Sequence, residues 1–264
     1  MKILNLNTHS LIEDNYNEKC EIFAQKVFEL KPDFITMQEV NQSIFSPWQK
    51  SLPENFTLCG NFPLRENNHA LKVWKMLNNF GLEYNFCWCG FKIGYEKFEE
   101  GLAIFSRFPI DNVSSFYITK SYDHLNWRTR KTLIINSGNF SIATTHTGWW
   151  EDKTEPLKYQ LDRLFEGLKE YKNLILTGDF NSPDTEDNKG YSYILSNGFF
   201  DTFTLAKNKD SGKTVMGKID GWENHQDKRI DYVFLNENKN VKSSYTLFDG
   251  PDKVSDHKGI IVTI

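Results

Sequence analysis

Short runs of apolar and β-branched residues recur along the whole chain, and they restrict its fold more than any other feature. Longer segments at 18–30, 70–80 and 155–171 instead carry apolar residues at helical spacing. The strand-like runs cover residues 2–8, 34–40, 84–91, 102–106, 113–119, 132–136, 140–145, 173–177, 230–235, 241–247 and 259–264. Because helices fall at intervals between strands, the pattern predicts an α/β fold in stacked layers.

The turn-forming residues between these runs support the same interpretation. Pro32 ends the first helical segment, Gly81 ends the second, and Ser137-Gly138-Asn139 predicts a hairpin turn between two strands. A short helix is expected at 191–196. The 264 residues contain no internal repeat, low-complexity tract or linker-like stretch, so we expect one domain over residues 1–264.

The charge balance limits the binding partners. Lys and Arg number 31 against 35 Asp and Glu, a net charge of −4, so no global attraction to nucleic acid or an anionic membrane is expected. A local basic groove is compatible with this balance. The chain has no apolar run long enough for a transmembrane helix and no signal peptide at its start, so we expect a cytoplasmic protein without membrane insertion.

The four cysteines show no CxxC pairing. Cys87 and Cys89 stand two residues apart in an apolar, aromatic run, where they share one strand face, and Cys20 and Cys59 are isolated. We interpret all four as reduced packing thiols rather than a metal or redox pair.

Polar residues concentrate where the apolar runs begin or end. Each has an ordinary structural explanation when taken alone, such as a cap, a solvated face or a satisfied core histidine. The set comprises Asn7, Gln38, Glu39, His146, Asp179, Asn181, Asp231, Ser255, Asp256 and His257.

Taken together, these residues indicate metal-assisted chemistry. The carboxylates of Glu39, Asp179, Asp231 and Asp256 and the amides of Asn7 and Asn181 form an oxygen-rich set, which suits Mg²⁺ or Mn²⁺ better than zinc. His146 and His257 add groups that titrate near neutrality, as expected where a phosphoryl group is attacked.

The motifs that hold these residues resemble the endonuclease/exonuclease/phosphatase superfamily, the DNase I-like metal-dependent phosphoesterases. The resemblance spans nearly the whole chain in the family's order, through LNLN, TMQEV, EGLAIFSRFPI, TTHTGWW, LTGDFNSP, RIDYVFL and SDHKGI. It implies a four-layer sandwich of two stacked mixed β-sheets flanked by helices, and a single domain.

The resemblance also implies roles for the metal-side residues. Asn7 and Glu39 match the family's early metal-site residues, with Glu39 as the principal carboxylate, and Asp256 matches a further metal-proximal acid. Asp179 matches the acid that orients or deprotonates the attacking water, and Asn181 matches the amide that binds a phosphoryl oxygen.

Three further residues follow from the same resemblance. His146 matches a phosphate ligand or general acid, and Asp231 matches the acid that holds His257. Asp179 and His257 are assigned jointly to water activation and phosphate stabilisation. Glu100, before GLAIFSR, stands where some members place an acid that pairs with the first histidine.

Aromatic and basic residues near these motifs are candidates for substrate binding. Trp149 and Trp150 follow His146, and Arg128 and Arg130 lie in the WRTRK run after Trp127. They could stack on a ring and grip a phosphate, or they could pack the sandwich edge and line a solvated strand. Trp222 is a further aromatic of this kind, whereas His9 is interpreted as a turn residue rather than part of the mouth of the site.

The expected activity is therefore Mg²⁺- or Mn²⁺-dependent hydrolysis of a small or single-stranded phosphodiester, in a nuclease-like manner. A phosphomonoesterase acting on an inositol polyphosphate or sugar phosphate is the alternative, and a non-catalytic binding module is a weaker one. The acidic balance argues against a duplex-DNA repair enzyme. The missing signal peptide argues against a secreted nuclease or sphingomyelinase, and no protein partner is implied.

Overall fold

The structure is a computed structural model and describes residues 1–60, 62–186, 189–219 and 226–264. One sheet has eight strands in the order β11-β13-β14-β1-β2-β5-β4-β3. Its strands are β1 (Lys2–Asn7), β2 (Phe34–Ser43), β3 (Phe56–Cys59), β4 (Asn85–Gly94), β5 (Phe98–Ser106), β11 (Asn208–Lys209), β13 (Ser243–Leu247) and β14 (Gly259–Thr263).

The second sheet has six strands in the order β10-β12-β9-β8-β7-β6. They are β6 (Asn112–Tyr117), β7 (Lys131–Ser137), β8 (Phe140–His146), β9 (Leu174–Asp179), β10 (Phe200–Asp201) and β12 (Asp231–Leu235). Parallel and antiparallel pairs occur in both sheets, since β1 runs parallel to β2 and β8 parallel to β9.

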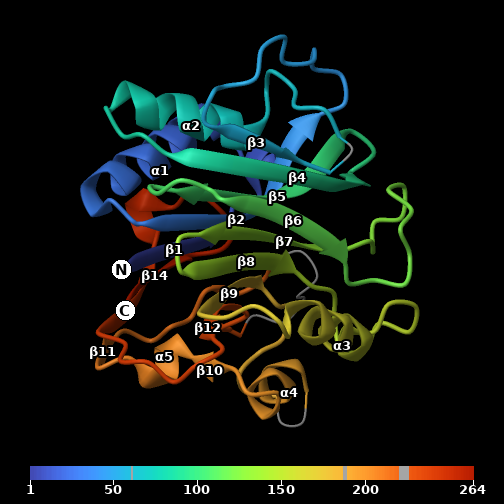
Figure 1. Cartoon of the computed structure of the whole chain (residues 1–264), viewed down its shortest axis with the longest axis vertical. Coiled ribbons are helices and arrows are strands. Elements are labelled where there is room, and N and C mark those ends of the chain that lie inside the picture. Colours follow the sequence, from blue (N-terminus) through green and yellow to red (C-terminus); the bar gives the residue numbers. More distant parts are fainter. Residues whose placement is uncertain (61, 187–188, 220–225) are drawn as a thin grey trace.

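The sheets stack face to face with helices on the two outer faces (Figure 1). Helices α1 (Tyr16–Leu30) and α2 (His69–Asn79) pack on the larger sheet, and α3 (Leu157–Leu168) and α4 (Gly190–Ser196) pack on the smaller one. The short helix α5 (Thr202–Leu205) follows β10. Between the sheets lies a third apolar cluster, to which both contribute. The predicted four-layer α/β sandwich is confirmed.

Most predicted elements are present with shifted ends. Strand β2 continues past the predicted end at residue 40, and β5 begins at Phe98 rather than at 102, because polar residues in both extensions are buried by partner strands. Strand β3 was not predicted, since only Phe56 and Cys59 of its four side chains are buried. The hairpin at 137–140 is confirmed, with Ser137 paired to Phe140.

The cysteines are all free and buried. Cys87 and Cys89 lie in the cluster between the sheets, on one face of β4, as predicted. In the described part of the chain, no helix is both long and apolar enough to cross a bilayer. The two chain ends lie side by side (Figure 1), where the Met1 amine donates to the Ile264 carbonyl at 2.9 Å.

Candidate active site

Strand register brings three of the predicted residues together in the smaller sheet. His146, the last residue of β8, is the parallel partner of Asp179, the last residue of β9. On the other side of β9, Asp231 at the start of β12 is the antiparallel partner of Asp179. Paired residues on adjacent strands point to the same face, so these side chains converge at one edge of the sheet.

The glycine before Asp179 permits the close approach of β8 and β9. Gly178 has a φ of +148°, and a Cβ atom at this position would lie 2.0 Å from the carbonyl oxygen of Thr145. A side chain here would therefore force the two strands apart and move Asp179 away from His146.

A bulge in the larger sheet aims Glu39 toward this edge. The register of β2 against β5 shifts between Met37 and Val40, and Glu39 has a left-handed φ of 51°. The Ser10 hydroxyl donates to the Glu39 carbonyl at 2.7 Å, which secures the distorted backbone. A strained, supported conformation of this kind is typical of a functional position.

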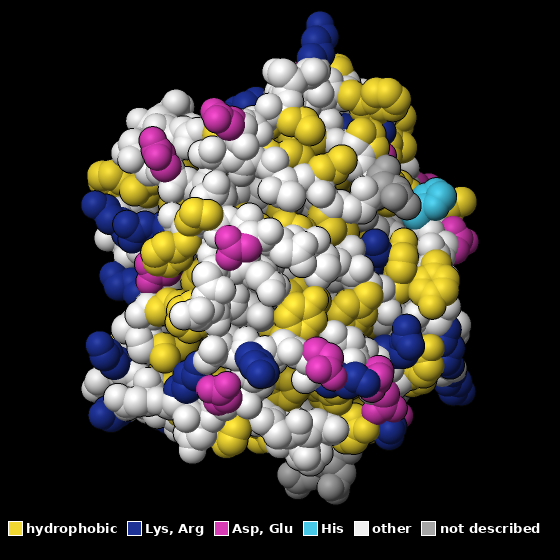
Figure 2. All heavy atoms as spheres, viewed as in Figure 1, with side chains coloured by type: hydrophobic (Ala, Val, Ile, Leu, Met, Phe, Trp, Pro, Cys, Tyr) yellow, Lys and Arg dark blue, Asp and Glu magenta, His cyan; other side chains and the backbone are white. Residues whose placement is uncertain are grey.

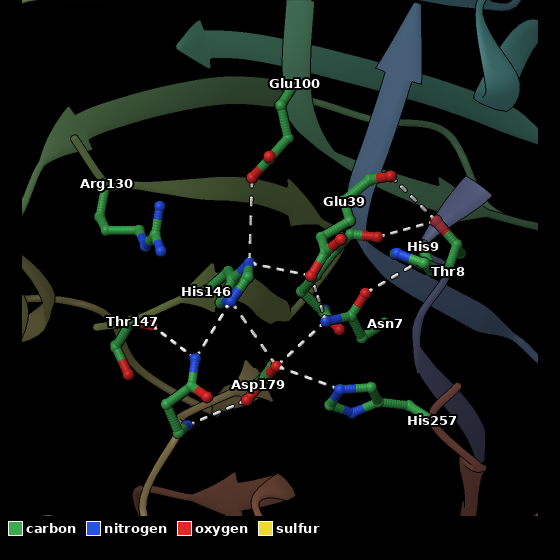
Figure 3. Close-up of polar contacts among 12 residues, drawn as sticks. Asn7, Thr8, His9, Glu39, Glu100, Arg130, His146, Thr147, Asp179 and His257 are labelled. Carbon is green, nitrogen blue, oxygen red and sulfur yellow. Dashed lines mark hydrogen bonds and ion pairs between the residues drawn. The ribbon is translucent and has the colours of Figure 1, made fainter. Parts of the chain in front are cut away.

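Asn7, at the end of β1, links the two sheets across the site. Its Nδ2 donates to Glu39 Oε1 at 2.8 Å and to Asp179 Oδ2 at 3.0 Å (Figure 3). The amide is buried and has both acceptors in place, so it fixes the separation of the two carboxylates.

His257 is held by Asp231. The two side chains are buried, and His257 Nδ1 lies 2.8 Å from Asp231 Oδ2, while His257 Nε2 lies 3.8 Å from Asp179 Oδ2. Burial would lower the pKa of His257, but the Asp231 carboxylate outweighs it and raises the pKa well above the ordinary value. His257 is therefore an imidazolium at neutral pH and acts as a donor.

His146 has the opposite electrostatic setting. Burial and the cations of Arg130 and Lys92 lower the pKa of His146 well below its ordinary value, so the ring is neutral. Its Nε2 lies 3.2 Å from Asn181 Nδ2 and 3.6 Å from Asp179 Oδ2. With Nε2 accepting from the amide, the proton resides on Nδ1, which is buried and has no hydrogen-bond partner among the described residues.

Glu100, on β5, faces His146. Its Oε1 lies 4.0 Å from His146 Nδ1 and 3.0 Å from the ammonium of Lys92 on β4. Lys92 also donates to the carbonyl oxygen of Trp127 at 3.2 Å. The buried lysine thus pairs with Glu100 and also contacts the segment that carries Trp127.

A cavity of about 280 Å³ opens above these residues. The described lining residues are His9, Glu39, Gly94, Tyr95, Glu100, Trp127, Arg130, His146, Trp149, Asp179, Asn181, Ile219, Asp256 and His257. Several lining residues carry buried polar atoms without a hydrogen-bond partner in the described part of the chain: His146 Nδ1, Arg130 Nε, Trp149 Nε1 and His9 Nε2. Unsatisfied donors facing a cavity indicate a polar ligand.

The acidic side of this cavity fits a divalent cation. Burial and the nearby carboxylates of Glu100 and Asp256 raise the pKa of Glu39, a repulsion that a bound cation would relieve. Among the described residues, two sets of His and acidic side chains have ligand atoms within 4.8 Å of one another: His9, Glu13 and Asp256, and the buried Asp179, Asp231 and His257. The carboxylates of Glu100 and Asp256 lie near Glu39, and carboxylate oxygens are ligands that Mg²⁺ and Mn²⁺ prefer.

Two of the four predicted substrate-binding residues lie away from the cavity, and the prediction is corrected for them. Arg128 is turned to Asp152, with Nε 2.8 Å from Oδ2, because its side chain stacks over Trp127 toward the surface. Trp150 packs on the α3–α4 face, where its ring centroid is 6.1 Å from that of Tyr193. Trp149 and Arg130 line the cavity.

Some lining or supporting residues were missed in the sequence. His9 has the left-handed φ of a turn residue, as predicted, but it also lines the cavity and bonds Glu13 at 2.7 Å. Lys92 had a usable signal, since it is a lone lysine directly after an apolar strand run. Glu13 and Tyr95 come from loops with no such signal. Trp222 lies outside the described residues.

Comparison with solved structures gives the same architecture. An endonuclease/exonuclease/phosphatase family protein from Leptotrichia buccalis shares 32% sequence identity over 100% of this chain and 99% of that chain, with a TM-score of 0.85. A mannosyl-6-phosphatase from Bacteroides thetaiotaomicron has 17% identity and a TM-score of 0.68 over 100% and 98% of the two chains.

A D. rerio TDP2 complexed with a single-strand DNA product has 15% identity and a TM-score of 0.65, covering 99% of this chain and 97% of that one. At these low identities the last two structures show the fold alone. Among curated proteins, no sequence matches the chain at a significant level. The sequence itself matches the Endonuclease/Exonuclease/phosphatase family over residues 13–257. With this match and the 32% identical structure, the chain belongs to the Endonuclease/Exonuclease/phosphatase family.

Proposed function

We propose that this protein hydrolyses a small phosphoester with the help of Mg²⁺ or Mn²⁺. The observation that carries the proposal is the position of Asp179 Oδ2, which lies 3.0 Å from Asn7 Nδ2, 3.6 Å from His146 Nε2 and 3.8 Å from His257 Nε2. A carboxylate held at the floor of a cavity between the Asn7 amide and the His257 imidazolium suits activation of water beside an anionic phosphoryl group.

Asp179 is the base in this proposal. Burial and the Asp231 carboxylate raise the pKa of Asp179 to about 7, which lets it accept a proton near neutral pH. The water oxygen bonds to phosphorus, the ester P–O bond breaks, and Asp179 accepts the water proton. The departing oxygen takes up a proton from solvent, to which Asp179 then releases the proton that it accepted. Ester and water thereby give alcohol and phosphate.

The other side chains stabilise charge on the phosphoryl oxygens. The His257 imidazolium donates from Nε2 and neutral His146 donates from Nδ1. Asn181 holds His146 Nε2 and thereby sets the direction of the Nδ1 donor, and Glu100 faces His146. Glu39 and Asn7, with Asp256 nearby, would hold the divalent cation. When bound, this cation supplies positive charge against the phosphoryl oxygens.

The dimensions of the site favour a small substrate over a long polymer. The cavity of about 280 Å³ is at the low end for ligand sites. On the face shown in Figure 2, Lys and Arg are interspersed with Asp and Glu, so the coloured side chains form no continuous positive track for a nucleic acid. Trp127 and Trp149 line the cavity with ring centroids 6.2 Å apart, where they can pack against the organic part of the substrate.

A substrate panel tests the proposal. Purified protein with Mg²⁺ or Mn²⁺ is assayed on p-nitrophenyl phosphate, bis-p-nitrophenyl phosphate, single- and double-stranded oligonucleotides and sphingomyelin, with Asp179→Asn as the control. We expect turnover of small esters that Asp179→Asn lacks. Saturable binding without turnover of any ester would contradict the proposal and favour a binding module.

A further inference from the structure

One arginine stands apart from the acidic side of the cavity. Among the described lining residues, Arg130 is the one arginine or lysine, and it is 2% exposed. Figure 3 shows it on the far side of His146 from Asn7 and His257. A buried guanidinium carries a permanent charge, so it needs an anionic partner.

The contacts of Arg130 leave one edge of its guanidinium unused. Its hydrogen bonds run from Nη1 to the carbonyl oxygens of Trp127 at 2.9 Å and Thr129 at 3.4 Å. In the described part of the chain, its Nε has no partner, and no ion pair holds the side chain. The Nε–Nη2 edge is the one that binds two oxygens of a phosphate or carboxylate side by side.

Nearby acids do not neutralise this edge. Glu100, the acid with the largest electrostatic effect on Arg130, is already engaged by Lys92 at 3.0 Å. Lys92 also shares the Trp127 carbonyl with Arg130, so the two cations are fixed by one backbone oxygen. Arg130 is therefore fixed before a ligand binds, and its Nε is left without a hydrogen-bond partner among the described residues.

The charge of the donor groups then distinguishes two classes of ester. The proposed function already places a divalent cation, the His257 imidazolium and neutral His146 against the phosphoryl oxygens. A phosphodiester has two terminal oxygens, whereas a phosphomonoester has three and carries an additional negative charge near neutral pH. Arg130 supplies a permanently charged donor for the third oxygen and its additional negative charge.

We propose that Arg130 makes this protein selective for the terminal phosphate of a phosphomonoester over a phosphodiester. The inference rests on the proposed function and narrows its substrate class. Arg128, two residues away, is the matched control, because it is paired with Asp152 and turned from the cavity.

The test compares kcat/KM for p-nitrophenyl phosphate and bis-p-nitrophenyl phosphate in wild type, Arg130→Gln, Arg130→Lys and Arg128→Gln. Loss of a hydrogen-bonded charge pair predicts a fall of about 10- to 150-fold on the monoester for Arg130→Gln. The fall on the diester should be under about threefold. Arg130→Lys should lose less kcat/KM on the monoester, since it keeps the charge. Arg128→Gln should leave the ratio of the monoester and diester kcat/KM values unchanged.

A binding measurement gives a second readout that does not need turnover. Inorganic phosphate and dimethyl phosphate are titrated calorimetrically into the same variants, after melting curves confirm folding. Arg130→Gln should weaken the binding of phosphate far more than the binding of dimethyl phosphate. If the glutamine variant does not fold, the comparison is made with Arg130→Lys.

The outcomes separate the two proposals. Equal losses on both esters and both anions, or no loss, would overturn the role of Arg130 while the hydrolase proposal stands. If wild type hydrolyses neither ester, the proposed function fails. The ratio of phosphate to dimethyl phosphate binding still decides whether Arg130 recognises a terminal phosphate.

Discussion

The carboxylate of Asp179 is the point at which separate parts of the chain meet. It contacts Asn7 from β1, faces His146 from β8 and faces His257 from the segment before β14. Its neighbours have opposite charge states, because His257 is paired with Asp231 whereas His146 lies beside Arg130 and Lys92. One histidine is thereby a cationic donor and the other a neutral one.

Replacement of the base or of the cationic donor should reduce turnover while leaving the fold intact. Asp179→Asn and His257→Ala should each lower kcat by about 10²- to 10⁴-fold, because both act in the transition state. Steady-state kinetics on variants shown to be folded by circular dichroism measure this. Near-normal kcat in either folded variant would refute the assigned roles.

The adjacent tryptophans should respond differently to truncation. Trp149 lines the cavity, so Trp149→Ala should raise KM for an ester with an aromatic alcohol, with stacking worth about 1–3 kcal/mol. Trp150 packs against Tyr193, so Trp150→Ala should instead cost about 1–3 kcal/mol of unfolding free energy. Melting temperature and KM for both variants measure the two effects, and identical behaviour would contradict the assignment.

At the scale of secondary structure elements, strand register does most of the assembly. His146 and Asp231 are both cross-strand partners of Asp179. They were predicted because His146 and Asp179 follow apolar runs and Asp231 lies inside one. The bulge that turns Glu39 toward them was not predictable, since its left-handed φ depends on β5 and on Ser10. Loop positions such as Tyr95 were missed because no periodicity places them.

The close approach of β8 and β9 provides a prediction at this scale. Gly178→Ala should destabilise the fold by more than about 2 kcal/mol and lower activity, because its Cβ would meet the Thr145 carbonyl at 2.0 Å. Gly81→Ala is the matched control. The φ of Gly81 is also positive, but no atom beyond its chain neighbours lies within 4 Å of a Cβ built there, so we expect a loss of about 1 kcal/mol in unfolding free energy. Urea unfolding measures the loss of unfolding free energy in both variants, and equal losses would exclude the steric explanation.

For the whole molecule, the central cluster joins the two sheets. Ile3 and Leu102 from the larger sheet and Leu133 and Ile175 from the smaller one lie in the same buried cluster. The layered fold could be predicted from the sequence, because apolar runs and helical periodicity record which faces are buried. The cavity could not, since its walls combine loops that are distant in sequence.

We propose that residues 1–264 form one cooperative domain, because neither sheet can expose its inner face without exposing that cluster. Urea unfolding should then give one transition, with tryptophan fluorescence and far-ultraviolet circular dichroism coinciding. Two resolved transitions would contradict a single domain.

The proposed activity depends on a divalent cation that Glu39 and Asn7, with Asp256 nearby, would hold, and metal removal tests this dependence directly. Initial rates of phosphoester hydrolysis are measured after exhaustive EDTA treatment and again after addition of Mg²⁺ or Mn²⁺, with wild type and Glu39→Gln side by side. We predict that chelation abolishes activity, that either cation restores it in wild type, and that Glu39→Gln requires far more metal. Full activity of the chelated wild type would contradict the proposed metal dependence.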